Sequence, residues 1–348
     1  MNKKRITYSD IAEALGVSKM TVSYALRNDP RISEAMRLRV QQKAEEMGYT
    51  PDPMLSALSS YRHSRHEKKA NAVLAWLNIQ RHPGKQREQG VFNLYWKGAR
   101  EAAEKLGFHL EEFQRSEISL QRMHTIFKAR GIRGLILSPT PQFEEPSENE
   151  LGHFPWKDYS MVRFGESLRA LNVNFVSSAQ VTNTILAFEQ VQQRGYRRIG
   201  FAGQYLRHRL FSAGYLWAQQ ALPRSRQLKP LFLPDEDSFQ RLETIRRWIE
   251  QQKPDAIICS APHMVQSLEK LGCRIPDDIG LVSMSRHDNP IDAGINQNAE
   301  EIGRTTILSL VSQLNENNYG IPATPKEILV EGRWVDGSML PDRKAENA

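Results

Sequence analysis

The sequence predicts an all-α N-terminal head followed by an α/β body of two lobes. Apolar residues recur at helical spacing through the first 50 residues, around a turn at Gly16. From Asn71 onward, short apolar runs alternate with amphipathic segments, which is typical of parallel sheets covered by helices on both faces. About ten such strands exceed one comfortable open sheet, so we expect two lobes.

The head is predicted to contain three helices. The first covers residues 8–15, where Thr7 and Asp10 form a T-x-x-D start whose hydroxyl can cap free backbone N–H groups. Ser18 is the expected N-cap of the second helix, and the third runs from Ser33 to Met47. Two short helices joined by a turn containing glycine are the signature of a helix-turn-helix. The expected inward residues are Ile11, Ala12, Leu15, Val22, Leu26, Val40 and Ala44.

Three side chains of the second helix are candidates for reading DNA, because the amino end of that helix enters the major groove first. Lys19 can donate to guanine O6 and N7, and Met20 can contact a thymine methyl group. Tyr24 can hydrogen-bond a base or a phosphate. The competing interpretation is an amphipathic helix whose polar face meets only water. Further candidate DNA-binding residues are Thr7, Ser18, Thr21, Ser23 and Arg27.

After the head, Pro51 interrupts the chain, and Asp52 with Pro53 forms a good start for a short helix. Leu55 and Leu58 lie at helical spacing in it. A helix of about two turns is marginal alone in water and needs a partner helix or DNA. The basic residues that follow are either a solvated linker or part of a hinge that folds on the phosphate backbone.

Residues Ile6 to about Leu58 resemble the headpiece of the LacI/GalR family of bacterial repressors. The resemblance rests on "DIAEALGVSKMTVS", then on "IS", then on the closing "GYTP". It implies that the second helix lies in the major groove and that Leu58 wedges into the minor groove at the operator centre, as apolar wedges that kink DNA do. The family often has arginine where this chain has Tyr24, so a different half-site is expected.

The body is predicted as alternating strands and helices. The acidic, proline-rich residues 138–155 are expected to form a surface loop of the first lobe. The expected strands are 72–78, 109–113, 134–138, 159–164, 198–203, 230–234, 256–260, 280–285, 327–332 and 333–335. The expected helices are 92–108, 120–131, 181–194, 210–221, 238–252, 264–272 and 299–316.

The body also resembles the effector-binding core of the same family, which is similar to periplasmic sugar-binding proteins. The runs that carry this resemblance are "GYRRIGFAG", "CRIPDDIGLVSM" and "GINQNAEEIG". Such a core implies a small molecule bound between the lobes, at the carboxyl ends of the strands. Arg209 fits the ligand-contacting arginine of the family. Trp217 at helical spacing is either a core residue, the more common case, or a residue that packs beside the ligand. The candidate effector-binding residues are Phe92, Arg163, Arg209, His263 and Gln297.

Three departures from the family concern the effector. Sugar-responsive members place aspartates where this chain has Ala179 and Ser285, and an [ND]-D pair where it has Ala261, Pro262 and His263. Because carboxylates at such points accept hydrogen bonds from sugar hydroxyls, an ordinary hexose is not expected. Two hypotheses remain: an anionic effector met by Arg163, Arg209 or His263, or a core that binds no small molecule.

Composition and motifs argue against other classes. The chain lacks the phosphate-loop, dinucleotide, zinc-protease and nucleophile-elbow motifs, so no catalytic residue, cofactor or metal is expected. "MNKKRITYSD" has no apolar region behind its basic start, so no signal peptide is expected. Cys259 and Cys273 are interpreted as two buried thiols of a protein of the reducing cytoplasm.

Charge and organisation lead to one functional prediction. Residues 1–70 carry 13 Lys and Arg against 8 Asp and Glu, while the rest carries 34 against 32, so the head is expected to meet an anion. The expected parts are a DNA-binding domain (1–50), a hinge helix and basic linker (51–70), a two-lobed effector-binding and dimerisation core (71–340) and a polar tail (341–348). Together they predict a homodimeric transcriptional regulator, by family default a repressor, on a pseudo-palindromic operator. The rival class is a cytoplasmic solute-binding or enzymatic protein whose head binds other proteins.

Overall fold

The computed structural model describes the chain with several gaps. Arg27, Leu55 and Leu58 lie outside the described residues, as do the expected hinge helix and linker. The described residues are 6–26, 29, 31–49, 72–79, 90–139, 151–165, 167–168, 170–204, 208–233, 242–259, 263–288 and 290–344.

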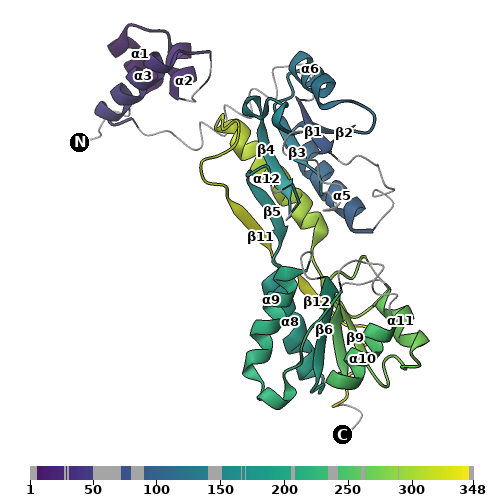
Figure 1. Cartoon of the computed structure of the whole chain (residues 1–348). Helices are drawn as coiled ribbons and strands as arrows, with labels where there is room; N and C mark the ends of the chain where they lie inside the picture. Colours follow the sequence, from purple (N-terminus) through teal and green to yellow (C-terminus); the bar gives the residue numbers. More distant parts are fainter. Residues whose placement is uncertain are drawn as a thin grey trace.

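The head contains the three predicted helices, α1 (Tyr8–Leu15), α2 (Lys19–Leu26) and α3 (Glu34–Glu46), drawn in purple in Figure 1. Gly16 ends α1 in the left-handed conformation at φ 66°, which glycine adopts without steric cost. Ile11, Val22 and Val40 are fully buried between the helices. Leu26 packs against the same core, as expected, but it is only partly buried, whereas the neighbouring Ala25 is fully buried.

The first lobe is a six-stranded parallel sheet covered on both faces. Its spatial order is β11 (Glu327–Val330), β5 (Phe175–Ser178), β4 (Ser160–Phe164), β3 (Gly134–Leu137), β1 (Ala72–Asn78) and β2 (Phe108–Gln114). Alternate side chains of β1 point to opposite faces, as strand geometry requires. Leu74 and Trp76 pack under α5 (Gly90–Lys105) and α12 (Ala299–Asn315), whereas Ala75 and Leu77 pack under α6 (Leu120–Arg130).

The second lobe repeats this architecture with one antiparallel edge. Its order is β12 (Arg333–Val335), β10 (Gly294–Asn296), β9 (Gly280–Ser283), β8 (Ala256–Cys259), β6 (Ile199–Gln204) and β7 (Leu231–Leu233). The helices α8 (Gln180–Gln193) and α9 (Arg209–Ala218) cover one face. The other face lies under α10 (Leu242–Gln252) and α11 (Met264–Lys270), as Figure 1 shows.

Two expectations about the strands were incomplete. The strands β5 and β10 were not predicted, because FVSS and GIN contain only one or two apolar residues and lack the apolar run that marks strands of similar length such as GLIL and AIIC. The expectation of parallel strands fails at β12, which pairs antiparallel with β10. An antiparallel edge strand on an otherwise parallel sheet is common in such folds.

Three other expectations about the body were wrong in part. Trp217 was expected in the core, but its side chain is 66% exposed on α9, because Tyr215 and Ala218 take the inward positions. The end of the expected surface loop is buried, since Leu151 and Phe154 pack in the first lobe core. Cys259 is buried, but Cys273 is only partly so.

The chain crosses between the lobes three times, and two asparagines join the crossings. Asn183 is 1% exposed; its amide donates to Ser178 Oγ at 2.8 Å, and its oxygen accepts the Gly332 N–H at 2.7 Å. The side chain of Asn298 donates to the Glu331 carbonyl at 2.7 Å. All three connections, β5 to α8, β10 to α12 and β11 to β12, are therefore held together.

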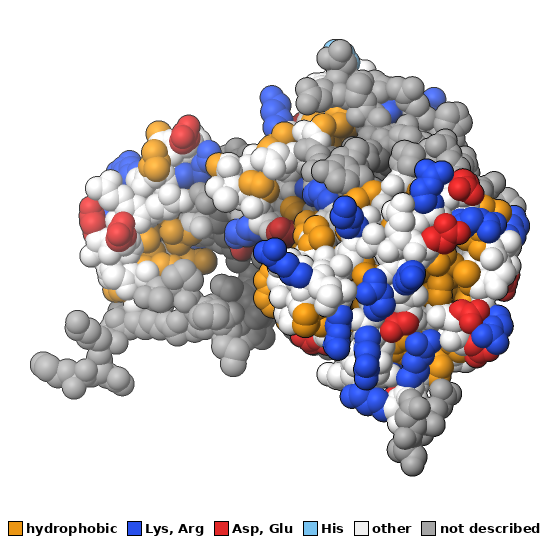
Figure 2. Space-filling model, turned by 60° about the horizontal axis from the view of Figure 1, so that its bottom comes forward, with side chains coloured by type: hydrophobic (Ala, Val, Ile, Leu, Met, Phe, Trp, Pro, Cys, Tyr) orange, Lys and Arg blue, Asp and Glu red, His pale blue; other side chains and the backbone are white. Residues whose placement is uncertain are grey.

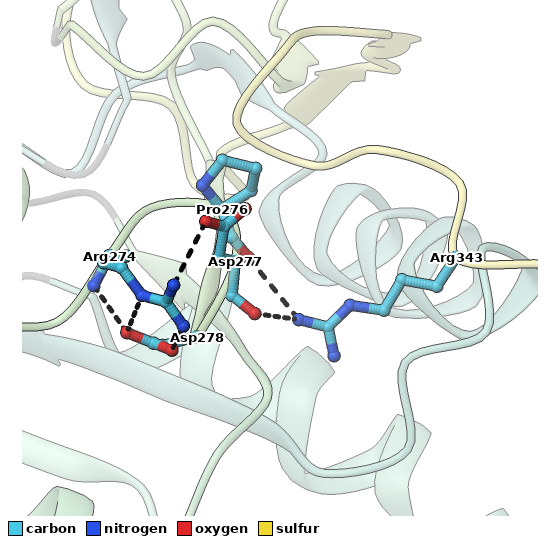
Figure 3. Close-up of polar contacts among 5 residues, drawn as sticks. All are labelled: Arg274, Pro276, Asp277, Asp278 and Arg343. Carbon is cyan, nitrogen blue, oxygen red and sulfur yellow. Dashed lines mark hydrogen bonds and ion pairs between the residues drawn. The ribbon is translucent and has the colours of Figure 1, made fainter. Parts of the chain in front are cut away.

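The expected polar tail is partly attached to the second lobe. Arg343 donates to the carbonyls of Pro276 and Asp277 at 3.4 and 3.2 Å, as Figure 3 shows, and its guanidinium lies 4.3 Å from the centre of the Tyr196 ring. Its backbone N–H also donates to the Arg194 carbonyl. No helix among the described residues is long and apolar enough to cross a membrane.

The helices α5 and α12 approach closely at two glycines. A Cβ on Gly98 would lie 1.9 Å from the Glu300 carbonyl oxygen, and one on Gly303 would lie 2.1 Å from the Tyr95 oxygen. Only glycine fits here, because backbone atoms cannot give way as a flexible side chain can. This contact fixes α12, which follows the second crossing, onto the first lobe.

The variant Gly303→Ala is expected to lower the free energy of unfolding by about 1–3 kcal/mol, because the added methyl overpacks the α5–α12 contact. Chemical denaturation measures this loss. Gly152→Ala is the matched control, since a Cβ there meets nothing within 4 Å, and it is expected to change stability by less than about 0.5 kcal/mol. Equal stability of the two variants would contradict the close contact.

Candidate nucleic-acid interface and effector site

The amino end of α2 is built as a capped, exposed helix start. Ser18 Oγ accepts the Thr21 N–H at 3.0 Å, which makes Ser18 the N-cap. The two hydroxyls also lie 2.9 Å apart, so both side chains support the cap. Lys19 is exposed and Met20 is 63% exposed, so the first turn presents a cation and an apolar tip to solvent.

Tyr24 is held by a residue that the sequence analysis missed. The Arg31 guanidinium lies 4.0 Å from the centre of the Tyr24 ring and donates two hydrogen bonds to the Asp29 carboxylate, at 2.9 and 2.7 Å. These hydrogen bonds lower the pKa of Asp29. Arg31 thus orients Tyr24, the candidate residue for reading DNA. The signal in the sequence was Asp29, an acid two residues before Arg31 that can fix the guanidinium.

The other described DNA-binding candidates of the head have local roles. The backbone N–H and the hydroxyl of Thr7 both donate to Asp10, each at 2.7 Å, so this carboxylate caps the start of α1. Ser23 is partly buried on α2. The structure brings Ser18, Lys19 and Met20 together at one helix end, with Tyr24 one turn further along.

Two effector candidates, Arg163 and Gln297, lie at or directly after the carboxyl ends of β4 and β10. Arg163 is 6% exposed; its guanidinium donates to the carbonyls of Gly165 and Ser167 and lies 4.1 Å from the centre of the Phe175 ring. It therefore supports the loop after β4. Gln297 is 9% exposed and donates to the Met284 carbonyl at 2.7 Å.

Arg209 and His263 begin the helices after β6 and β8. Arg209 is the first residue of α9, and His263 is the N-cap residue of α11; both are partly exposed. Beside Arg209, the nearly buried His208 accepts the Gln204 N–H on Nδ1 at 3.0 Å, so its proton is on Nε2. His208 was not a predicted site residue, although it directly precedes the predicted arginine.

A carboxylate lies between the lobes, at a position that the sequence analysis did not identify. The Ser285 hydroxyl donates to Asp288, in the loop after β9. Burial raises the pKa of Tyr95, and the charge of Asp288 raises it further, which places Tyr95 near this carboxylate. Phe92 contacts Tyr95 edge-on, with ring centres 6.2 Å apart.

The same region joins the two lobes. A Cβ on Gly90, the first residue of α5, would lie 2.5 Å from the His287 carbonyl oxygen. Phe92, Tyr95, Ser285 and Asp288 thus belong to the contact between the α5 start and the loop after β9. Within the described residues, no group of three or more His, Cys, Asp or Glu could hold a metal ion.

Two protein-family models match the chain. The model described as bacterial regulatory proteins, lacI family, matches residues 7–52. The model described as a periplasmic binding protein-like domain matches residues 188–338. The two matches fall on the head and, for the most part, on the second lobe.

Curated relatives match along most of their length. The chain is 23% identical to the HTH-type transcriptional regulator PtxS of Pseudomonas aeruginosa, over 95% of this chain and 96% of PtxS. It is 25% identical to the HTH-type transcriptional repressor CytR of Escherichia coli K12, over 90% of this chain and 91% of CytR.

Solved structures share the fold. A complex of the transcriptional regulator CelR with cellobiose superposes with a TM-score of 0.56 at 19% identity, covering 96% of this chain and all of that one. The Lac repressor dimer bound to operator and the anti-inducer ONPF gives 0.56 at 18% identity, over 97% of this chain and 100% of that one.

Replacing Arg31 by methionine is expected to raise the pKa of Asp29 toward its ordinary value of about 3.8, because the two hydrogen bonds are lost. A lowered carboxyl pKa stabilises the folded head at every pH above the ordinary pKa of the carboxyl. This stabilisation is lost as the pH falls through the lowered pKa. NMR titration of the Asp29 carboxyl measures the shift. Arg39→Met, at an exposed position of α3, is the control and should leave the Asp29 titration unchanged.

Proposed function

As a member of the LacI family of bacterial regulatory proteins, this chain is a DNA-binding transcriptional regulator, and we propose that it reads a pseudo-palindromic operator as a homodimeric repressor. The operator-bound Lac repressor dimer supports this assembly. The curated relatives are regulators and not enzymes, which supports a role without catalysis. Such a role places the chain in the cytoplasm, with the DNA.

The single observation that carries the proposal is the exposed, capped start of α2. Ser18 fixes the helix end, Lys19 supplies a donor for guanine, and Met20 supplies an apolar contact for a thymine methyl group. These three residues lie inside the range matched by the lacI model. Because Ser18 accepts a free backbone N–H group at the helix end, the side chains of the first turn remain available for the major groove.

Further residues complete the proposed DNA contact. Tyr24, oriented by Arg31, contacts a base or a phosphate. We propose that Leu55 and Leu58, which lie outside the described residues, belong to a hinge helix that forms on DNA, with Leu58 as the wedge in the minor groove. The proposed backbone contacts are Thr7, Ser18, Thr21, Ser23 and Arg27.

We further propose an anionic effector between the lobes. Arg209 and His263 begin helices at the carboxyl ends of β6 and β8, where α/β lobes hold their ligands. Gln297 and Phe92 complete the proposed contacts, and Arg163 shapes the loop after β4. Effector binding shifts the equilibrium between lobe arrangements and with it the affinity for DNA.

In vitro selection of bound DNA from a random pool is expected to yield two related half-sites with a fixed spacing. Met20→Ala is expected to weaken binding to the selected duplex by about 1 kcal/mol or more, mostly at one base pair, because the contact with a thymine methyl group is lost. Leu38→Ala is the matched control, since Leu38 is 60% exposed but lies on α3. Enrichment of no sequence would refute the proposed function.

A thermal-shift screen tests the effector. A saturating sugar acid or similar anion is expected to stabilise the full chain by about 2.7 kcal/mol at a hundred times its Kd, because it binds the folded state alone. Arg209→Gln should remove the effect, while the exposed Arg122→Gln on α6 should retain it. Stabilisation by neutral hexoses alone would contradict the anionic class, and none by any compound would favour a core without a ligand.

A further inference from the structure

The second lobe contains a long stretch of chain without acidic residues. Residues 190–234 carry 8 Lys and Arg and no Asp or Glu. The body as a whole is nearly balanced, with 34 basic and 32 acidic side chains after residue 70. Positive charge is therefore concentrated locally, although the net charge of the body is small.

The fold brings five of these cations, and Lys253 from further along the chain, to one edge of the second sheet. The parallel strands β6, β7 and β8 all start at this edge, directly after Arg198, Pro230 and Asp255. We define the basic patch by the cations that precede these strands: Arg197, Arg198, Arg224, Arg226, Lys229 and Lys253. All are exposed except Arg198, which is partly buried.

Arg198 holds the three segments of the patch together. Its guanidinium donates to the Ser225 carbonyl at 3.1 Å, to the Lys253 carbonyl at 2.9 Å and to the Gln252 carbonyl. The Lys229 N–H donates to the Gln252 side chain at 2.9 Å. The arrangement is therefore fixed by the fold, although the other five cations extend into solvent.

Neighbouring carboxylates neutralise the charge of the patch only in part. Asp255 lies within it and offsets one of the six positive charges; its two oxygens accept the backbone N–H groups of Arg197 and Arg198, at 2.8 and 2.9 Å, and not a patch side chain. In the described part of the chain, no patch side chain forms an ion pair. By contrast, Arg274 at the same edge pairs with Asp277 and Asp278, as Figure 3 shows.

The composition of the patch fits phosphates better than a protein surface. Figure 2 shows many Lys and Arg side chains on the face of the body that comes forward. The exposed large hydrophobic residues that the structure describes all lie outside 197–198, 224–229 and 253. Protein interfaces need apolar or aromatic anchors at their centre, whereas arginine forks suit phosphate oxygens.

We propose that the basic patch binds the phosphate backbone of a second DNA duplex while the heads hold the operator. The patch lies at the amino edge of the second sheet, opposite the carboxyl edge of the proposed effector site. Binding there needs neither the reading helix nor the effector. One dimer bound to its operator thus joins two segments of DNA.

The test uses the full chain on an immobilised, selected operator. Operator retention is measured first, and capture of a labelled duplex of unrelated sequence is then measured between about 50 and 200 mM salt. In the triple variant R197E/R224E/R226E, capture should fall at least tenfold. The slope of log affinity against log salt should become shallower by about 2 to 3, because about three phosphate contacts are lost. Operator retention should change less than twofold.

Two matched variants complete the design. R246E/R247E reverses two exposed arginines of α10 that lie 3.9 and 3.5 Å from Glu243, and it should capture the second duplex normally. R197K/R224K/R226K keeps the charge and should retain most of the capture, which separates charge loss from misfolding. Wild-type capture by the triple reversal would overturn the proposal and favour an acidic protein as the partner. An equal loss of capture in R246E/R247E would also overturn the proposal. A failure to bind the operator would appear in the first measurement, so it can be told apart from a loss of capture.

Discussion

The two-lobed body depends on the hydrogen bonds of the Asn183 side chain. Neither lobe is one continuous stretch, because the chain passes between them three times. A single buried amide accepts from the third crossing and donates to the first, and Asn298 joins the second crossing to the third. A buried amide left without these partners would cost about 1–3 kcal/mol. The proposed effector contacts and the proposed change in lobe arrangement would both occur around this junction.

Much of the head was predictable because its signals are local. The capping residues Thr7 and Ser18, the left-handed Gly16 and the inward Val22 all act within a few residues of their own position. The body was predictable in outline, since long helices carry strong periodicity. β5 and β10 were missed because their one or two apolar residues form no run, and the strands are defined only by pairing with their neighbours. Trp217 was misplaced because helical spacing alone does not tell which side faces the core.

The candidate site was predictable only where one residue acts by itself. The exposure of Lys19 and Met20 at the start of α2 follows from their position in a helix-turn-helix. Arg31 was missed because its role depends on stacking over Tyr24, which is a tertiary contact. Asp288 was missed because the family pattern concerns only position 285. The loop brings the carboxylate of Asp288, three residues later, to the Ser285 hydroxyl. Arg163, in contrast, has its guanidinium committed to loop carbonyls, which no spacing rule reveals.

The edge strand β11 also determines when the protein can fold during synthesis. The first lobe is completed by Glu327–Val330, so it waits for almost the whole chain, whereas the head is complete by residue 49. At translation rates of 5–20 residues per second, roughly 15 to 55 s separate the two events. A DNA-binding head can thus form on the ribosome well before the body, through which we propose that two copies associate. A nascent chain can therefore touch DNA only as a single head, without the second half-site contact that a dimer provides.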